Sequence, residues 1–151
     1  LGEFEKRNTI VIGASCDTPE VHFAWLSTAK ENGGIEGITY PILADSNRNL
    51  SSILGILDIT NEIYDEATGT VQVEGDNVSY RATYLIDEEG MVFHEGINHM
   101  PIGRNVQEFI RLVDAYTHLQ THGEVCPANW EEGKDAMAPN AKDTAEYLAV
   151  H

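Results

Sequence analysis

Two strand-like runs joined by a short turn constrain the fold of this chain more than any other feature of its sequence. Residues 81–86 and 91–97 are rich in β-branched and aromatic side chains, and Asp87-Glu-Glu-Gly90 lies between them. This pattern predicts a β-hairpin with a four-residue loop. Residues 105–119 then carry apolar side chains at helical spacing, which predicts an amphipathic helix.

Upstream of this hairpin, predicted strands and helices alternate. Asp17-Thr-Pro-Glu20 predicts the start of a helix, because a capping residue precedes a proline. Phe23, Ala24 and Trp25 are expected on or near the buried side of that helix. The other expected elements are strands at 9–15 and 40–44, helices at 21–30, 47–54 and 141–150, and a surface hairpin within 58–79. Together they predict an α/β or α+β sheet protein.

Composition excludes several classes of function. The chain of 151 residues carries 25 acidic and 9 basic side chains, a net charge of −16. This balance argues against binding to nucleic acid or to an anionic membrane surface. We identify no apolar run long enough for a membrane helix and no secretory leader, and therefore expect a cytoplasmic protein with one domain.

The two cysteines are too few for a disulfide-built scaffold and are considered as reactive groups. Cys126 lies in an irregular acidic tail, with Glu124 nearby and no adjacent base, so it is not expected to attack an oxidant first. It could attack second, because a sulfenic acid on another cysteine condenses with an ordinary thiol. Cys16 lies at a strand-to-helix junction beside Asp17. It is either a reactive thiol favoured by the helix N-terminus or a small side chain filling the end of the strand.

The sequence disfavours two further chemistries, metal binding and dithiol exchange. His118 and His122 have the i, i+4 spacing of metal ligands on a helix face, but no third ligand accompanies them, and Gly123 is expected to end the helix. The sequence has no Cys-x-x-Cys pair, so a thioredoxin-type oxidoreductase is disfavoured. No metal or cofactor is expected.

The residues around Cys126 are more specific than the cysteine itself. His122-Gly-Glu-Val-Cys126-Pro-Ala-Asn-Trp130 resembles the resolving-cysteine motif of the typical two-cysteine peroxiredoxins, the alkyl hydroperoxide reductase group. Other segments resemble the same family in the same order along nearly the whole chain. They are Ile10-Val-Ile-Gly-Ala-Ser-Cys-Asp17, His22-Phe-Ala-Trp25, Gly33-Gly-Ile-Glu-Gly37, Tyr40-Pro-Ile-Leu-Ala-Asp45, Tyr80-Arg-Ala-Thr-Tyr-Leu-Ile-Asp87 and Asn98-His-Met-Pro-Ile-Gly-Arg104.

The resemblance implies a thioredoxin-like fold and a thiol peroxidase acting on hydrogen peroxide and organic hydroperoxides. In that family a peroxidatic cysteine becomes a sulfenic acid, a resolving cysteine of the partner subunit forms an intersubunit disulfide, and a dithiol reductant opens it. By position, Cys126 matches the resolving cysteine. Arg81 matches the arginine that favours the thiolate and polarises the peroxide, and Arg104 matches a supporting arginine. The resemblance also implies a homodimer, reduced by a thioredoxin-like protein or a flavoprotein disulfide reductase, and leaves open a decameric ring.

One departure from the family pattern is large. The Pro-x-x-x-Thr-x-x-Cys motif of the peroxidatic cysteine is absent from these 151 residues. Residues 1–7 resemble the last turns of a helix, so the motif is expected upstream. Residues 1–120 are expected to form the C-terminal portion of the peroxiredoxin core, and 121–151 a tail with the resolving cysteine. The alternative is a truncated, inactive thioredoxin-fold module that serves oligomer assembly or acts as a holdase.

Overall fold

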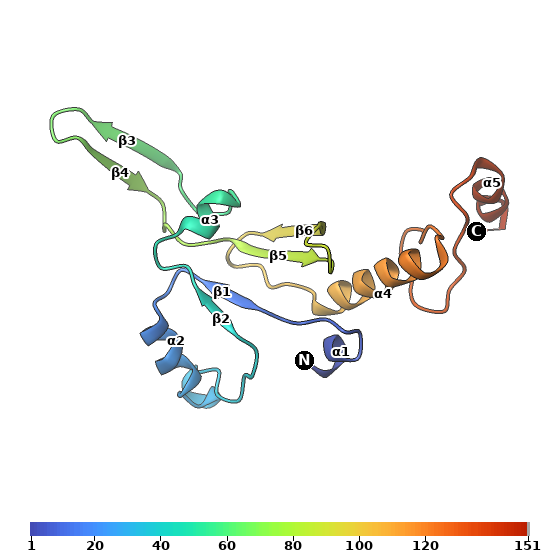
Figure 1. Cartoon of the computed structure of the whole chain (residues 1–151). Coiled ribbons are helices and arrows are strands. Elements are labelled where there is room, and N and C mark those ends of the chain that lie inside the picture. The colour runs from blue at the N-terminus through green and yellow to red at the C-terminus, as the bar shows by residue number, and fades with distance from the viewer. Residues whose placement is uncertain (151) are drawn as a thin grey trace. The chain divides into compact units, whose positions relative to one another are not determined.

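The computed structural model describes residues 1–150 and has mixed helix and strand structure (Figure 1). Its elements are α1 Gly2–Glu5, β1 Gly13–Ser15, α2 Pro19–Leu26, the 3-10 turn η1 Lys30–Asn32, β2 Ile42–Ala44, α3 Asn49–Ile53, β3 Asn61–Asp65, β4 Thr70–Glu74, β5 Arg81–Ile86, β6 Val92–Asn98, α4 Val106–His122 and α5 Ala141–Val150. Within this described part of the chain, no helix is both long enough and apolar enough to cross a membrane.

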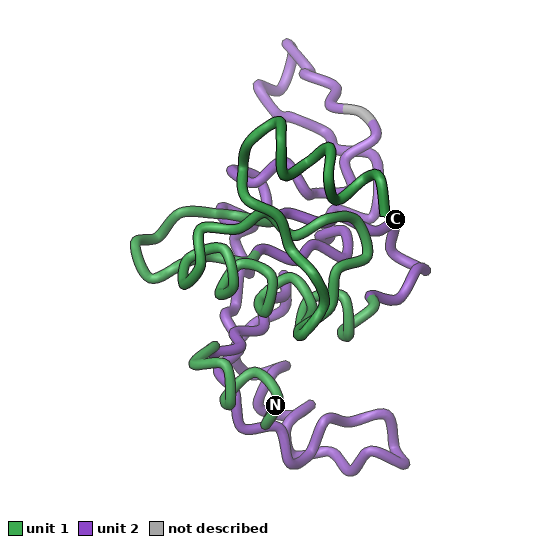
Figure 2. Tube along the Cα trace, turned by 90° about the vertical axis from the view of Figure 1, so that its right-hand side faces the viewer, with its two compact units in different colours: residues 1–9, 85–94, 105–151 green, residues 10–84, 95–104 purple. Residues whose placement is uncertain are grey.

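The chain forms two compact units that interleave along the sequence (Figure 2). The first unit contains residues 1–9, 85–94 and 105 onwards, and the second contains residues 10–84 and 95–104. The hairpin of β5 and β6 contributes residues to both, because its turn belongs to the first unit and its outer ends belong to the second.

The described strands pair as three two-stranded sheets: β1 with β2, β3 with β4, and β5 with β6. The first pair is parallel, with Gly13 opposite Ile42 and Ser15 opposite Ala44. The expected strand over residues 9–15 is therefore too long, since pairing covers only its last three residues. The physical reason is that β2 is itself three residues long, so residues 9–12 have no strand beside them among those described.

Helix α2 has the capped, proline-containing start that the sequence predicts, but it spans Pro19–Leu26 instead of residues 21–30 and buries a different face. Thr18 caps it through a hydrogen bond that its hydroxyl oxygen accepts from the amide of Val21, and Pro19 occupies the first turn. Phe23 and Trp25, expected near the core, are 73% and 41% exposed, and Ala24 is exposed as well; the buried side chain is His22. The apolar side chains of this helix are distributed around its whole circumference, so its sequence pattern does not define one inward face.

The hairpin and the long helix agree with the sequence. β5 and β6 pair, and α4 is capped by Asn105, whose side chain accepts a hydrogen bond from the amide of Gln107. Gly123 ends the helix at φ +69°, a conformation that glycine adopts without strain. The apolar core of the first unit consists of Leu85, Ile110, Val113 and Trp130.

Candidate active site

Two arginines of the second unit each donate a hydrogen bond to a backbone carbonyl in the segment that carries the other. Arg81 is the first residue of β5, and its Nε donates a hydrogen bond to the carbonyl of Met100 at 3.2 Å. Arg104 follows β6 and donates from one terminal nitrogen to the carbonyl of Ala82 at 3.0 Å. The loop between β6 and Arg104 is held by Asn98, whose amide nitrogen donates to the carbonyl of Gly103 at 2.9 Å. These backbone contacts position both guanidinium groups.

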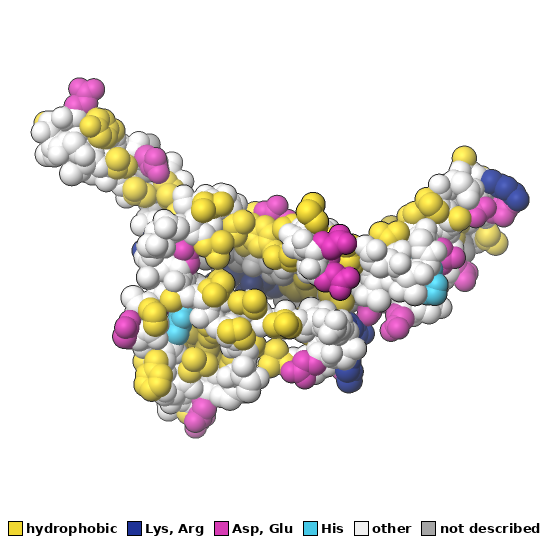
Figure 3. Space-filling view, viewed as in Figure 1, with side chains coloured by type: hydrophobic (Ala, Val, Ile, Leu, Met, Phe, Trp, Pro, Cys, Tyr) yellow, Lys and Arg dark blue, Asp and Glu magenta, His cyan; other side chains and the backbone are white. Residues whose placement is uncertain are grey.

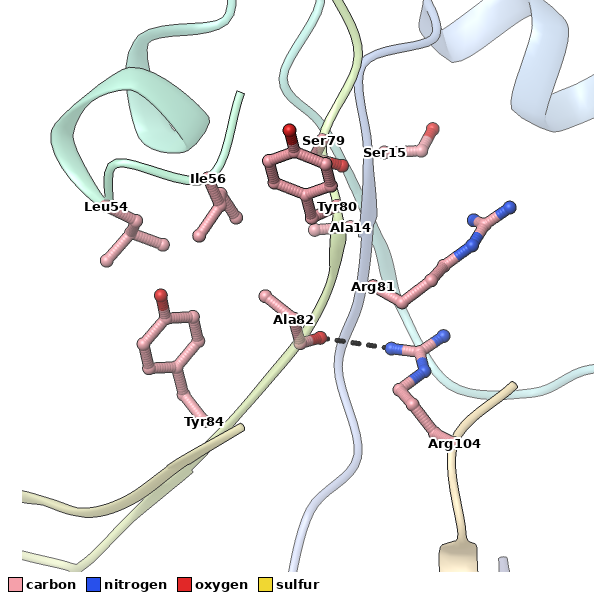
Figure 4. Close-up of a pocket in the computed structure, with 10 residues that line it drawn as sticks. All are labelled: Ala14, Ser15, Leu54, Ile56, Ser79, Tyr80, Arg81, Ala82, Tyr84 and Arg104. Carbon is pink, nitrogen blue, oxygen red and sulfur yellow. Dashed lines mark hydrogen bonds between the residues drawn. The ribbon is translucent and has the colours of Figure 1, made fainter. Parts of the chain in front are cut away.

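Arg81 and Arg104 line one hollow of about 140 Å³ (Figure 4). Figure 4 shows both side chains on the same side of the strand segment that carries Tyr80 and Ala82. Tyr84 lines the same hollow, and burial, with an added contribution from the hydrogen bond to Glu95, raises the pKa of Tyr84 to about 12. The tyrosine therefore stays neutral, and the two arginines supply the charge of the hollow.

A neighbouring hollow of about 260 Å³ brings in a third arginine. Arg48 and Arg81 both line it, together with Cys16 and Asp17. Arg48 Nε donates to the carbonyl of Asn77 at 2.7 Å. Arg48 acts on the nearby Asp45 carboxylate, and Asp17 lines the same hollow. In the described part of the chain, however, none of these three arginines forms an ion pair with a carboxylate. Their charge makes this surface a favourable place for a thiolate or a developing oxyanion.

Cys16 is half-buried at the end of β1, with its Sγ 3.7 Å from Ser51 Oγ. The Ser51 hydroxyl donates its proton to Asp45 at 2.6 Å, so the thiol is the donor in the contact between Cys16 and Ser51. This geometry fits a small side chain that fills the strand end. The thiol also lines a hollow with Arg48 and Arg81.

A serine, a histidine and an aspartate meet beside the same hollow, and the sequence reading missed them. Ser15 Oγ lies 2.7 Å from Nε2 of the buried His22 and donates to Asp17 at 2.8 Å. Because the hydroxyl proton goes to Asp17, the imidazole nitrogen must donate to Ser15 and cannot act as its base. The cluster therefore fastens α2 to β1 and is not a nucleophile–base pair.

Cys126 belongs to the first unit and lies on a segment that packs against α4. Val125 and Met137 form an antiparallel bridge, with hydrogen bonds of 2.7 and 3.1 Å between their backbones. Trp130 is buried, and the Cys126 thiol lies 3.7 Å from the carbonyl of Ala115 in α4. Within this irregular segment the buried Trp130 side chain serves as an anchor, and Cys126 is half-buried.

The charges around Cys126 oppose each other. Burial raises the pKa of its thiol above the usual value, Arg111 acts to lower it, and Glu124 acts to raise it further. Arg111 is held in place by Glu108, which accepts two hydrogen bonds of 2.7 Å, and by the carbonyl of Trp130 at 3.1 Å. A raised pKa keeps the thiol protonated at neutral pH.

Arg111 is the functional neighbour that sequence reasoning missed. It lies fifteen residues before Cys126, far outside the window in which a local base was sought. The sequence did carry a sign that Arg111 is held in place. Glu108 and Arg111 are three residues apart, a helical spacing at which they form an ion pair on the surface of α4. Arg81 and Arg104 both line one hollow of the second unit, whereas Cys126 belongs to the first unit.

The rings of the two histidines considered as metal ligands are tilted by 40° to each other, with centroids 4.5 Å apart. His118 Nε2 lies 2.8 Å from a carboxylate oxygen of Glu124, and its ring also faces that of Trp130 at 4.9 Å. In residues 1–150, no group of three or more histidine, cysteine, aspartate or glutamate side chains is arranged to hold a metal ion.

Comparison with known proteins gives two family matches. The model of the AhpC/TSA family matches residues 1–95, and the model of the C-terminal domain of 1-Cys peroxiredoxin matches residues 115–148. The chain is 38% identical to peroxiredoxin-2 of Bos taurus over 99% of its own length and 67% of the relative's. It is 38% identical to alkyl hydroperoxide reductase C of Helicobacter pylori, covering 97% of this chain and 66% of that protein.

A solved structure is also similar. The reduced 2-Cys peroxiredoxin of Plasmodium vivax superimposes with a TM-score of 0.83 at 36% identity, over 98% of this chain and 68% of that one. The similarity extends through both compact units, because it covers nearly all of the chain.

Proposed function

This chain belongs to the AhpC/TSA family of peroxiredoxins, which are peroxidase oxidoreductases, and we propose that it supplies both the arginine site and the resolving thiol of a thiol-dependent peroxidase. Its fold is the thioredoxin-like fold of that family. The observation that carries the proposal is the hollow lined by Arg81 and Arg104, neither of which pairs with a carboxylate among the described residues.

The arginine hollow would act on the first step. A thiolate attacks the terminal oxygen of a hydroperoxide, the O–O bond breaks, and the sulfur becomes a sulfenic acid while the leaving oxygen takes up a proton as water or an alcohol. A guanidinium beside the sulfur favours the thiolate, and a second stabilises the charge that develops on the leaving oxygen. The attacking cysteine belongs to a Pro-x-x-x-Thr-x-x-Cys motif that these 151 residues do not contain.

Cys126 would act on the second step. Its sulfur attacks the sulfenic sulfur, an S–S bond forms, and the hydroxyl group leaves as water with the thiol proton. A raised pKa suits this role, because a protonated thiol does not compete for peroxide at neutral pH. A dithiol reductant then exchanges with the disulfide and regenerates both thiols.

In the proposed assembly, the disulfide joins two subunits of a homodimer. β6 is a candidate for pairing across the two-fold axis, because its edge opposite β5 lacks a strand partner among the described residues. Residues 17–21 are the candidate contact between dimers if a decameric ring forms. We place the protein in the cytoplasm, where a dithiol reductant keeps such disulfides transient.

The decisive experiment follows the cross-link itself. A complete subunit that contains the peroxidatic motif is treated with one equivalent of hydrogen peroxide, alkylated, and mapped by peptide mass spectrometry under non-reducing conditions. The proposal expects Cys126 in an intersubunit disulfide, and expects Cys126→Ser to abolish the reducible dimer while Cys16→Ser keeps it. A Cys126 that stays free and alkylated after peroxide treatment would refute its assignment as the resolving thiol.

A second candidate is a role without turnover, as an oligomer-assembly module or a holdase. It is favoured by the apolar side chains that the second unit leaves exposed, among them Ile10, Phe23 and Ile53. Light scattering from a heat-denatured client protein tests this candidate. Suppression of scattering by the 151-residue chain, with no peroxide consumption by the complete subunit, would favour it over the peroxidase.

A further inference from the structure

The hairpin of β3 and β4 extends away from the rest of the second unit and takes no part in the arginine hollows (Figure 1). Its base is fixed to that unit. Asp58 donates its amide to the carbonyl of Val78 at 2.9 Å, and the Tyr80 hydroxyl donates to the Asp58 carboxylate at 2.8 Å. Leu57 and Ser79 add an antiparallel bridge. The hairpin is therefore an ordered projection and not a loose loop.

The turn at its tip is closed by one carboxylate. Asp65 accepts hydrogen bonds from the amide of Ala67 at 2.9 Å and the hydroxyl of Thr68 at 2.8 Å. These bonds hold the pKa of Asp65 below its usual range, so the tip carries a negative charge at neutral pH. Gly69 completes the turn at φ +67°.

The register assigns the side chains of the hairpin to two unlike faces. Glu62 lies opposite Val73 and Tyr64 opposite Val71, and residues directly opposite each other share a face of an antiparallel pair. One face therefore carries Tyr64, Val71 and Val73 with Glu62, and we call it the Tyr64 face. The other face carries Ile63 with Gln72 and Asp65 with Thr70.

The Tyr64 face is open to solvent. Tyr64 is 63% exposed, Val71 56% and Val73 40%. Two-stranded hairpins are marginal in water without a covered apolar face, so three such side chains side by side indicate a surface that is covered when the protein functions. Figure 3 shows hydrophobic and acidic side chains next to each other along this projection.

Charge selects what can cover it. Residues 49–80 contain no lysine, arginine or histidine and six acidic residues: Asp58, Glu62, Asp65, Glu66, Glu74 and Asp76. A second copy of this hairpin would bring like charges together, and like charges opposite each other destabilise strand pairs. We call these six residues the acidic rim: Glu62 lies on the Tyr64 face, Asp65 and Glu74 lie on the opposite face, and the other three lie just outside the two strands. A partner in which an apolar strip is accompanied by lysine and arginine complements both the Tyr64 face and this negative charge.

We propose that the Tyr64 face is a docking surface for a partner protein, bound through an extended segment in which apolar residues alternate with lysine or arginine. The apolar residues pack on Tyr64, Val71 and Val73, and the basic residues lie against the acidic rim. The hairpin edges offer unpaired backbone groups to such a segment. This interaction is independent of the peroxidase chemistry, because none of its residues lines the arginine hollows.

A defined probe tests the proposal on the 151-residue chain. The probe is a short fluorescent peptide in which valine alternates with lysine, and its binding is followed by anisotropy and by amide chemical shifts. We expect shifts confined to the β3–β4 hairpin. The paired substitution Tyr64→Ser with Val71→Ser should weaken binding about tenfold, because these side chains form the centre of the surface.

Matched controls separate the surface from the acidity of the whole chain. Gln72→Ser changes the opposite face of the same hairpin, and Glu88→Gln with Glu89→Gln removes charge from the β5–β6 turn. Both variants should bind the peptide as the parent does, and a peptide of alternating serine and lysine should bind about tenfold more weakly. Far-UV circular dichroism and amide shifts outside residues 58–79 confirm folding of each variant.

Three outcomes would overturn the inference. If the serine–lysine peptide binds as tightly as the valine–lysine peptide, the contact depends on charge alone. If the β5–β6 turn variant weakens binding as much as Tyr64→Ser with Val71→Ser does, the contact depends on the net charge of the chain. Self-association detected by sedimentation velocity and lost in the Tyr64→Ser, Val71→Ser variant would make a second copy the occupant.

Discussion

In a chain with 25 acidic side chains, an arginine without a carboxylate partner needs an explanation. Arg7 and Arg111 have such partners, in Asp114 and Glu108. The unpaired arginines of the second unit gather on two adjoining hollows. Motif resemblance predicted two of them, Arg81 and Arg104. It could not predict that Arg48 joins them, because that contact depends on how α3 and the segment before β5 are placed in space.

The first prediction concerns charge geometry at the arginine hollow. In the complete peroxidase, Arg81→Lys keeps a positive charge but loses the planar fork, so kcat/KM for hydrogen peroxide should fall about 10- to 100-fold. The same kcat/KM should fall less in Arg104→Lys, because we assign Arg104 a supporting role. Lys30→Arg lies away from the hollows and is the control, and its kcat/KM should equal that of the parent. Equal activity of Arg81→Lys and the parent would remove Arg81 from the mechanism.

A second prediction isolates the charge beside the resolving thiol. Glu124 acts to raise the pKa of Cys126, so Glu124→Gln should lower that pKa and speed alkylation by iodoacetamide at pH 8, by about two- to fivefold. Glu132→Gln makes the same charge change in the same tail and should leave the rate alone. Rates are read by mass spectrometry of the Cys126 peptide. A slower reaction in Glu124→Gln would contradict the electrostatic account.

At the scale of elements, the sequence predicted types better than lengths. The β5–β6 hairpin and α4 were anticipated because their alternation and helical spacing are strong local signals. The strand over residues 9–15 was predicted too long, since strand ends are set by the partner, and β2 offers three residues. The prediction of the buried face of α2 was wrong because Ser15 holds His22 inward. This contact joins residues seven positions apart, and apolar periodicity does not reveal it.

The capping carboxylate of α3 gives a third prediction. Burial alone would raise the pKa of Asp45, but hydrogen bonds from Ser51 and from the amide of Leu50 outweigh burial and hold it below its usual value. Asp45→Ala leaves these donors without an acceptor and should lower the free energy of unfolding by about 2 kcal/mol. The exposed neighbour Ser46→Ala should change it by less than about 0.5 kcal/mol. Urea denaturation measures both.

A fourth prediction links the β5–β6 turn to α4 through pH. The Tyr116 hydroxyl donates to Asp87 at 2.7 Å, and this bond, with those from backbone amides of the turn, lowers the pKa of Asp87. Tyr116→Phe keeps the stacking on Phe93 but loses the bond, so Tm at pH 7 should fall by about 2–4 °C.

The sign of the pH dependence follows from the depressed pKa. A carboxylate of this kind stabilises the fold above its unfolded-state pKa, and the contribution is lost as pH falls through the lower folded-state value. The Tm difference between the parent and Tyr116→Phe should therefore be full at neutral pH and narrow in acid. Thermal scans across that range check it, and a difference that widens in acid would contradict the assignment.

At the scale of the whole molecule, each compact unit contains one of the two tryptophans. Trp25 belongs to the second unit and is partly exposed, whereas Trp130 belongs to the first and is buried. β5 and β6 are continuous strands that contribute to both units, so we expect the units to unfold together. The sequence predicted one domain with a tail from residue 121, but the interleaving of the two units along the chain depends on long-range contacts that no local pattern encodes.

The fifth prediction uses these two reporters. Trp25→Phe leaves only Trp130, and its fluorescence midpoint in urea should coincide with the midpoint from circular dichroism of the parent. Amide hydrogen exchange in β1 and β2 should report the same global free energy as exchange in α4. Two separated transitions would show that the units are energetically independent.

The chain passes between its two units four times, after residues 9, 84, 94 and 104. Neither unit therefore corresponds to a contiguous gene fragment, and neither can be grafted into another scaffold by a single recombination event. A chimera with a relative would keep both halves of the chemistry only if its crossover points leave the stretch from residue 81 to residue 104 from one parent.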